Sequence, residues 1–218
     1  MNDSITIALS KGWNFAPALE LLDKLGLSTL PLRENSRKVL FQDPENGVTY
    51  IVLRPSDIPT YVEHGAADIG IVGKDILLEQ SRDVYEPLDL KFGFCRLVVA
   101  EPQDAQQQDD PSRWIHLRVA TKFPRITEQH FSRKGIHVEI IKLYGAIELA
   151  PLVGLSELIV DLVSSGQTLV ENGLAEVEEI RKISARLIVN RASHKTRYDR
   201  VEEIIQGFQK AVAAIVGC

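Results

Sequence analysis

Short apolar runs alternate along the chain with segments in which apolar residues recur at helical spacing. The apolar runs predict buried strands, at residues 5–9, 48–53, 68–72, 95–100, 117–120, 137–141, 158–163 and 185–190. The helical spacing predicts helices, at about residues 15–25, 57–64, 125–134, 146–153 and 201–215. Because strands and helices alternate, the pattern predicts an α/β fold with largely parallel sheets.

A polar segment interrupts this alternation near the middle of the chain. Residues 101–111, with the sequence EPQDAQQQDDP, show no apolar periodicity and indicate a loop or a boundary. We therefore expect two α/β lobes. Ligands in such sheets bind beyond the carboxyl ends of the strands, where loops lead into helices. Five loops occupy this position: Ser10–Gly12, Arg54–Ser56, Gly73–Asp75, Lys142–Gly145 and Ser164–Thr168.

Composition and charge exclude several classes of protein. Among the 218 residues, 44% are hydrophobic and 25% are charged, as in ordinary globular proteins. No apolar run approaches the roughly 20 residues of a membrane-spanning helix, and the N-terminus lacks an export signal, so we expect a cytoplasmic protein without a membrane partner. The net charge of −5 argues against nucleic-acid binding, which requires a basic surface. A few cations that converge in a cleft can still attract a small polyanion.

The loop SSGQT, at residues 164–168, combines hydroxyl groups with a glycine directly after an apolar run. Backbone N–H groups at the start of a helix, together with serine and threonine hydroxyls, can hold a phosphate, and Gly166 lets the backbone approach it closely. Asp161, near the end of the preceding strand, can accept hydrogen bonds from sugar hydroxyls or help to orient Mg²⁺. An ordinary turn in which a hydroxyl caps the next helix explains the same residues.

Four cations lie near predicted strand ends in the first lobe: Lys11, Arg33, Arg37 and Arg54. Each has an ordinary alternative, as a solvated lysine in a turn, a surface ion pair or a solvated strand edge. Taken together with a hydroxyl-rich loop that faces them from the second lobe, they favour a cleft that binds phosphates. The two cysteines and five histidines do not have the spacing of a metal site.

The segment ELAPLVGLSELIVDLVSSGQTL, residues 148–169, resembles the signature of the ATP phosphoribosyltransferase family, whose members catalyse the first step of histidine biosynthesis. Other segments resemble the same family and together span most of the chain: ALSKG (8–12), SRKVLF (36–41), PSDIPTYVEHGAADIGIVGKD (55–75), ATKFP (120–124), EIIKLYGAIELAPLVGL (139–155) and SARLIVN (184–190). One difference is Trp13, which stands where family members commonly have an arginine.

The resemblance implies a two-lobed fold like that of periplasmic type II binding proteins, with the active site in the cleft between the lobes. The first lobe would comprise residues 1–98 and 187–218, and the second lobe residues 99–186. The chain has the length of the family's short form, which lacks a histidine-binding regulatory domain and works with a separate regulatory subunit similar to histidyl-tRNA synthetase. We therefore expect a dimer within a larger hetero-oligomer.

The implied reaction joins N1 of the adenine of ATP to C1 of the ribose of phosphoribosyl pyrophosphate and expels pyrophosphate. Its main requirements are to position the reactants and to stabilise the negative charge of the leaving group. Mg²⁺, bound mainly by the pyrophosphate oxygens rather than by the protein, would share the second task. A strong general base is not needed, because N1 of adenine is already a neutral nucleophile.

The resemblance also gives each candidate residue a role. The cations that would face the pyrophosphate and the triphosphate of ATP are Lys11, Arg33, Arg37 and Arg54. The residues that would bind the 5-phosphate are Ser164, Ser165, Gly166, Gln167 and Thr168. Asp161 and Glu148 would contact the ribose hydroxyls, and the walls would be completed by Gly73, Lys74, Asp75 and Tyr144. Alternatively, Glu148 is a helix-surface carboxylate, Tyr144 a packing residue and Asp75 a helix cap.

Two other classes of protein share features with this sequence. The same fold serves solute-binding proteins that catalyse nothing, and the segment AADIGIVGKD (66–75) alone would suit one of them. The missing export signal and the loop of hydroxyls and glycine argue for the enzyme instead. A degenerate, purely structural subunit would have no need to retain Lys11, Arg54, Asp161 and Gly166.

Overall fold

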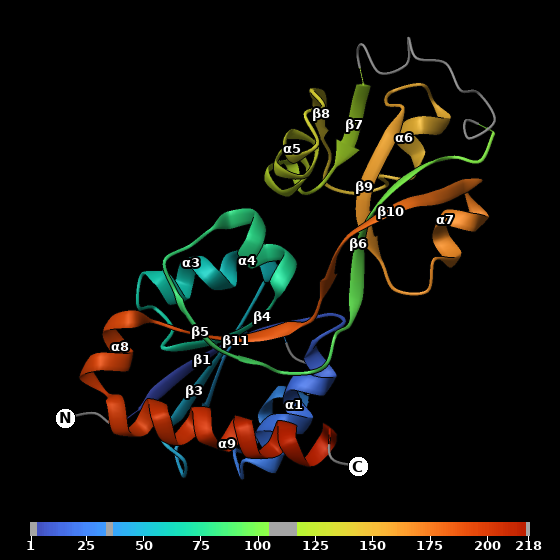
Figure 1. Cartoon of the computed structure of the whole chain (residues 1–218). Coiled ribbons are helices and arrows are strands. Elements are labelled where there is room, and N and C mark those ends of the chain that lie inside the picture. The colour runs from blue at the N-terminus through green and yellow to red at the C-terminus, as the bar shows by residue number, and fades with distance from the viewer. Residues whose placement is uncertain (1–3, 34–36, 105–116, 217–218) are drawn as a thin grey trace. The chain divides into compact units, whose positions relative to one another are not determined.

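The computed structural model describes residues 4–33, 37–104 and 117–216, which form two compact α/β units (Figure 1). Unit 1 combines Met1–Gly93 with Ser184–Cys218, and unit 2 is the continuous stretch Phe94–Ile183. The expected lobe boundaries, after residues 98 and 186, fall inside strands β6 (Cys95–Pro102) and β11 (Ala185–Val189). Within the polar segment 101–111, residues 105–111 lie outside the described residues.

Unit 1 is built on a six-stranded mixed sheet with the strand order β2-β3-β1-β4-β11-β5. Besides β11, its strands are β1 (Ile5–Ser10), β2 (Leu40–Asp43), β3 (Val48–Leu53), β4 (Ile69–Gly73) and β5 (Tyr85–Asp89). Its helices are α1 (Phe15–Lys24), α2 (Leu30–Arg33), the 3₁₀ turn η1 (Pro55–Asp57), α3 (Ile58–Glu63), α4 (Lys74–Gln80), α8 (Arg191–Thr196) and α9 (Tyr198–Val216). Since β1 pairs in parallel with both β3 and β4, the carboxyl ends of these three strands meet at one edge of the sheet.

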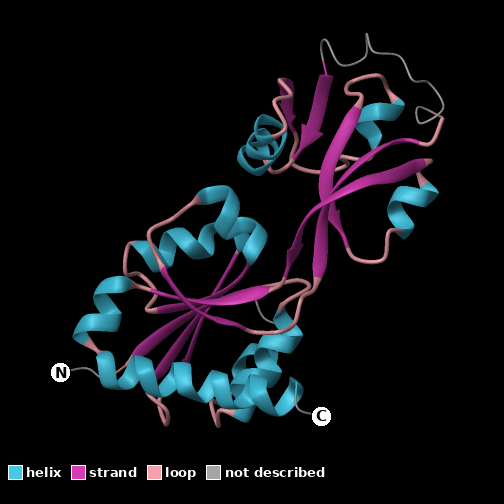
Figure 2. Cartoon of the chain, in the orientation of Figure 1, coloured by secondary structure: helices cyan, strands magenta, loops and turns pink. Residues whose placement is uncertain are grey.

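Alternation along the strands of unit 1 separates two hydrophobic layers. Ile5, Ile7 and Leu9 of β1 pack in one cluster with α1 and α9, whereas Ala8, which points to the opposite face, packs with α3 and α4. Figure 2 shows helices on both faces of this sheet. Burial on both faces explains why the run 5–9 is apolar except at Thr6 instead of alternating regularly with polar residues.

A buried carboxylate fastens the C-terminal segment to this sheet. Asp68 is 4% exposed and accepts hydrogen bonds from the Thr6 N–H (2.8 Å), the Ser193 hydroxyl (2.6 Å) and the Arg197 guanidinium (3.0 Å). Ser193 belongs to α8, and Arg197 directly precedes α9. One side chain therefore joins the start of β1 to both C-terminal helices.

Unit 2 is built on a five-stranded mixed sheet with the strand order β10-β6-β9-β7-β8. Besides β6, its strands are β7 (Leu117–Thr121), β8 (Val138–Lys142), β9 (Leu158–Val163) and β10 (Leu174–Ile183). Its helices are α5 (Pro124–Arg133), α6 (Leu149–Leu152) and α7 (Gln167–Glu171). The helices α6 and α7 lie on one face of the sheet and α5 lies on the other (Figure 1).

The predicted strands all occur, with their ends shifted by a few residues at most, but the prediction of largely parallel sheets is wrong. Five of the nine strand pairs are antiparallel: β2–β3, β4–β11, β5–β11, β6–β9 and β6–β10. The helix expected at 146–153 is shortened to α6, because Ala146 adopts a left-handed φ of 48° and the helix begins only after it. The strands β2, β5 and β10 and the helices α2, α4 and α8 were not predicted.

At Gly70 in β4, buried apolar side chains leave no room for a Cβ atom. A Cβ atom there would lie 2.7 Å from Ile58 Cγ2, 2.9 Å from Val62 Cγ2 and 3.2 Å from Ile188 Cγ1, and all three side chains belong to a buried cluster. We expect Gly70→Ala to lower the free energy of unfolding by about 1–3 kcal/mol, because overpacking forces these side chains apart. Denaturant unfolding followed by circular dichroism measures this change.

The matched control is Gly145→Ala, because a Cβ atom at Gly145 meets nothing within 4 Å. Equal stability of the two variants would contradict the close packing of α3 on β4.

Candidate functional site

In unit 1, the loops that carry predicted site residues leave the sheet at the same edge. Ser10 at the end of β1 pairs with Leu53 at the end of β3, so Lys11 and Arg54 begin their loops side by side. Both side chains are exposed and have no hydrogen bond or ion pair with the part of the chain that the structure describes. They are therefore available to an anionic ligand, as is expected of cations that bind phosphates.

Arg33 and Arg37 lie in a different setting. Arg33 ends α2, where its guanidinium lies 2.5 Å from Asp23 Oδ2 and 3.1 Å from Thr29 Oγ1. Burial raises the pKa of Asp23, but hydrogen bonds from Thr29 and Arg33 outweigh this effect and lower it overall. Arg33 thus forms a surface ion pair, whereas its ordinary alternative was a solvated strand edge, and Arg37 is exposed.

The loop at the end of β4 is held by interactions within unit 1. The Lys74 ammonium lies 2.6 Å from Glu86 Oε2, and the Lys74 N–H donates to the Ser184 carbonyl at 3.0 Å. Asp75 is 8% exposed, and its Oδ1 lies so close to Gly73 that an added Cβ atom would be 2.1 Å away. These interactions fix the start of α4, and Lys74 reaches a ligand only by leaving Glu86.

Unit 2 contains a pocket of about 240 Å³ at the end of β9. It is lined by Glu148, Ile159, Asp161, Leu162, Val163, Ser164, Ser165, Gly166, Thr168 and Leu169. Six of the eleven residues predicted to bind substrate are in this set: Glu148, Asp161, Ser164, Ser165, Gly166 and Thr168. Residues 148 and 168 are brought together because α6 and α7 cover the same face of the sheet.

Two other candidates in unit 2 do not line the pocket. Gln167 donates from Nε2 to Glu171 Oε1 at 2.7 Å, along the surface of α7. Tyr144 is 81% exposed, with the Lys142 ammonium 5.5 Å from the centre of its ring. Tyr144 is thus not the packing residue that was its ordinary alternative.

The turn at 164–168 has the backbone shape that a phosphate cradle needs. Gly166 adopts a left-handed φ of 82°, which glycine tolerates without strain. As the residue that caps α7, Gly166 has no side chain with which to bind the helix N–H groups, and Ser165 Oγ accepts only a long hydrogen bond of 3.4 Å from the Gln167 N–H. Ser164, Ser165 and Thr168 are exposed. These three hydroxyl groups therefore contribute little to capping α7 and remain able to bind a ligand.

Asp161 lies where β9 enters the pocket, and its charge is poorly compensated. Burial raises the pKa of this carboxyl, and the nearby charge of Glu148 raises it further. The Leu162 N–H, which donates to Asp161 Oδ1 at 2.8 Å, and the charge of Lys122 oppose the rise without cancelling it. A carboxylate in this setting gains from hydroxyl donors, such as those of a ribose, or from a cation.

Lys122 does not line the pocket, but its charge acts on Asp161, and it was not among the predicted candidates. The signal was available, since Lys122 follows the predicted strand 117–120 as closely as Lys11 follows the strand 5–9. It also belongs to the segment ATKFP, one of those that resemble the family.

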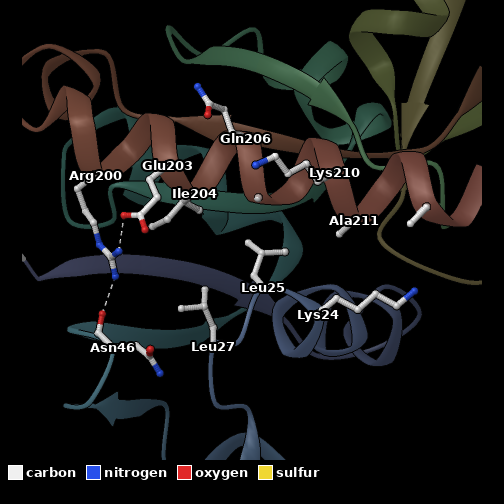
Figure 3. Close-up of a pocket in the computed structure, with 12 residues that line it drawn as sticks. Lys24, Leu25, Leu27, Asn46, Arg200, Glu203, Ile204, Gln206, Lys210 and Ala211 are labelled. Atoms are coloured by element: carbon white, nitrogen blue, oxygen red, sulfur yellow. Dashed lines mark hydrogen bonds and ion pairs between the residues drawn. The ribbon is translucent and has the colours of Figure 1, made fainter.

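A larger groove, of about 640 Å³, lies elsewhere in unit 1 (Figure 3). Residues from the end of α1, the turn after β2 and the exposed side of α9 line it, among them Lys24, Asn46 and Lys210. Arg200 crosses it, donating to the Asn46 carbonyl and to Glu203, each at 2.6 Å. None of the predicted site residues lines this groove, so its size does not make it the candidate site.

In residues 4–33, 37–104 and 117–216, no group of three or more His, Cys, Asp or Glu side chains is arranged to hold a metal ion. The pocket does present two carboxylates, Asp161 and Glu148, and oxygen ligands of this kind suit Mg²⁺ that is held mainly by a substrate. None of the helices in these stretches has both the length and the hydrophobicity to cross a membrane.

Two mixed α/β units, one of them with a hydroxyl-lined pocket at the end of a strand, define an α/β protein of the type II periplasmic-binding-protein fold. The aliphatic sulphonate-binding protein SsuA from Escherichia coli shares this fold, with a TM-score of 0.60, 12% identity, and coverage of 96% of this chain and 72% of that chain. The family model described as HisG, ATP phosphoribosyltransferase, matches residues 54–210. The chain belongs to the ATP phosphoribosyltransferase family.

Individual relatives agree with this assignment along the whole chain. ATP phosphoribosyltransferase 2 from Geobacter sulfurreducens is 58% identical over 212 residues, which are 97% of this chain and 100% of the relative. ATP phosphoribosyltransferase from Syntrophotalea carbinolica is 54% identical over 217 residues, covering 100% of this chain and 99% of the relative. A chain of the ATP phosphoribosyl transferase (HisG:HisZ) complex from Thermotoga maritima has a TM-score of 0.80 and 34% identity, with coverage of 96% of this chain and 99% of that chain.

Because the pKa of Asp161 is raised, this residue is expected to lower the free energy of unfolding by an amount that depends on pH. Ionising this carboxyl costs more in the folded chain, where it is buried beside Glu148, than in the unfolded chain. This cost shrinks as the pH falls through the raised folded pKa, because the folded chain takes up a proton first, and it is gone below the ordinary value of 3.8. We expect Asp161→Asn to raise the melting temperature at pH 7 and to raise it less at pH 4, since the amide oxygen can still accept from the Leu162 N–H.

Thermal unfolding at both pH values measures this difference. Glu171→Gln, on the exposed side of α7, is the control that changes a carboxylate outside the pocket lining. A melting temperature that Asp161→Asn lowers equally at both pH values would contradict the unfavourable burial of this charge.

Proposed function

We propose that this protein transfers the phosphoribosyl group of phosphoribosyl pyrophosphate to N1 of the adenine of ATP and releases pyrophosphate, the first step of histidine biosynthesis. The observation that carries the proposal is the pocket at the end of β9. It gathers six residues that the family resemblance had assigned to the sugar phosphate, although they are up to 20 positions apart in the sequence, from Glu148 to Thr168.

In unit 2, the cradle at 164–168 binds the 5-phosphate through backbone N–H groups and hydroxyls, with Gly166 allowing close approach. Asp161 and Glu148 accept hydrogen bonds from the ribose hydroxyls. These bonds offset the cost of holding two carboxylates near each other. The two negative charges therefore support binding of a hydroxyl-bearing group of the substrate, rather than a phosphate, beside Asp161 and Glu148. Gln167 contributes through its backbone, because its side chain is engaged with Glu171.

In unit 1, Lys11 and Arg54 bind the pyrophosphate and the triphosphate of ATP. Their shared sheet edge and their lack of partners among the described residues support this role. Arg37 is exposed and can join them, whereas Arg33 would first have to leave Asp23, and Lys74 would have to leave Glu86. Trp13, 73% exposed in the loop after Lys11, offers an aromatic surface instead of the arginine common in the family.

A divalent metal ion, Mg²⁺ in this proposal, supplies charge neutralisation on the pyrophosphate oxygens when it is bound. Asp161 and Glu148 are the carboxylates in unit 2 that would hold it together with the substrate. The chain's own residues do the remaining work: they bind the phosphates, orient the ribose and place its C1 against the adenine.

Regulation by histidine through a separate subunit is part of the proposal. The Thermotoga maritima structure is a complex of HisG with HisZ, and its matched chain is covered over 99% of its length. We infer that this chain likewise works in the cytoplasm as a dimer within a hetero-oligomer, with a regulatory subunit similar to histidyl-tRNA synthetase.

Turnover of the two substrates tests the function directly. ATP, phosphoribosyl pyrophosphate and Mg²⁺ are mixed with the protein, with and without the regulatory subunit, while the adenine absorbance and the release of pyrophosphate are followed. We expect both signals to require both substrates and to rise in equal amounts. Failure of both signals with and without the regulatory subunit would reject the proposal.

Arg54 is expected to stabilise the negative charge that develops on the leaving group. Arg54→Ala should lower kcat by a factor on the order of 10²–10³, the usual loss when one preorganised charge stabiliser is removed. Steady-state kinetics measures the loss. Arg82→Ala is the matched control, since Arg82 is an exposed arginine of unit 1 that pairs with Glu63. Near-normal turnover by Arg54→Ala would show that the leaving group is stabilised elsewhere.

A further inference from the structure

Lys122 lies in a turn that is clamped on both sides by buried residues. Thr121 is 0% exposed, donates from Oγ1 to the Val160 carbonyl at 2.8 Å, and accepts from the Phe123 N–H at 2.9 Å. Phe123 is 2% exposed, and its carbonyl accepts from Thr127 Oγ1 at 2.8 Å. Lys122 is the exposed residue between these anchors. The turn therefore fixes the position from which its side chain extends.

Lys122 leaves the sheet beside the face that carries the pocket. Ala120 belongs to the cluster that contains Ile159, Val163 and Leu169, and these three residues also line the pocket. Lys122 is the first residue after β7, and its charge is near enough to act on Asp161 in the pocket lining. The parallel register pairs Thr121 with Val160, so the next residue on each strand is Lys122 on β7's side and Asp161 on β9's.

Lys122 is also free to bind a ligand. Its ammonium has no hydrogen bond or ion pair among the described residues, although it lies close enough to influence the ionisation of Asp161. A lysine that served only the fold would be expected to pair with Asp161 or Glu148. Instead it remains unpaired beside a pocket whose own charged side chains are both negative.

We propose that Lys122 is a substrate-binding residue that contacts the diphosphate of phosphoribosyl pyrophosphate. This inference rests on the proposed function. The 5-phosphate already has the cradle at 164–168, which follows Asp161 along the chain. Lys122 approaches the ribose-binding carboxylate from the neighbouring strand β7, and so meets the donor at the end that carries the diphosphate.

The test compares binding of two halves of the donor, inorganic pyrophosphate with Mg²⁺ and ribose 5-phosphate, by isothermal titration calorimetry. We expect Lys122→Met to weaken pyrophosphate binding about tenfold, the usual size for one charge-assisted contact at an exposed site, and to leave ribose 5-phosphate binding within about twofold. Lys122→Arg, which keeps the charge, should recover most of the lost affinity. Lys134→Met, which removes an exposed lysine directly after α5 that pairs with Glu178, should leave both affinities unchanged.

Each outcome decides between distinct conclusions. Equal pyrophosphate affinity in the native protein and Lys122→Met overturns the inference while leaving the proposed function intact. Weakened ribose 5-phosphate binding with unchanged pyrophosphate binding also overturns it, because Lys122 would then serve the other phosphate. If the native protein binds neither ligand and shows no turnover, the proposed function and the inference fail together. Unchanged thermal unfolding of Lys122→Met confirms that the variant is folded.

Discussion

The parallel pairing of a few central strands is the constraint on which the candidate site depends. In unit 1, β1 lies between β3 and β4 and runs in the same direction, and in unit 2, β7 pairs in parallel with β9. The carboxyl ends of parallel strands lie at the same edge of a sheet. Residues that are distant in the sequence but directly follow such strands therefore lie side by side. Lys11 and Arg54 are brought together in this way, and the same parallel pairing puts Lys122, directly after β7, next to Asp161 within β9. The antiparallel strands complete the sheets but add no further loops of this kind.

The sequence was most informative where burial alone decides the structure. The apolar runs at 5–9 and 158–163 became β1 and β9 because most of their side chains are buried, with Thr6 and Asp161 as the polar exceptions. The strand β10 was missed because the large apolar residues of LAEVEEIRKI recur every third position, a spacing closer to that of a helix than to the alternation expected of a strand at the edge of a sheet. Strand direction was misjudged, because periodicity does not record which segment returns to pair.

For the site, the residues on one continuous motif were the ones that sequence could place. Glu148, Asp161 and the turn around Gly166 meet in one pocket. Arg33 and Lys74 form ion pairs with residues of other elements, Asp23 of α1 and Glu86 of β5. A local sequence pattern does not predict such ion pairs. Lys122 was overlooked for a related reason. Its importance lies in the unpaired charge that the fold places beside Asp161, and this relation exists only after β7 and β9 have paired.

The order of strands in unit 1 also bears on how the chain is assembled during synthesis. Strand β11, near the C-terminus, lies between β4 and β5. Asp68 can accept its hydrogen bonds from Ser193 and Arg197 only after these residues have been synthesised. Unit 2, by contrast, is one continuous stretch that leaves the ribosome before β11 does. Domains generally fold as units while translation proceeds. The insert can therefore reach its native state while the unit that contains the N-terminus still lacks a central strand, and the first-made half of the protein is the last to be completed.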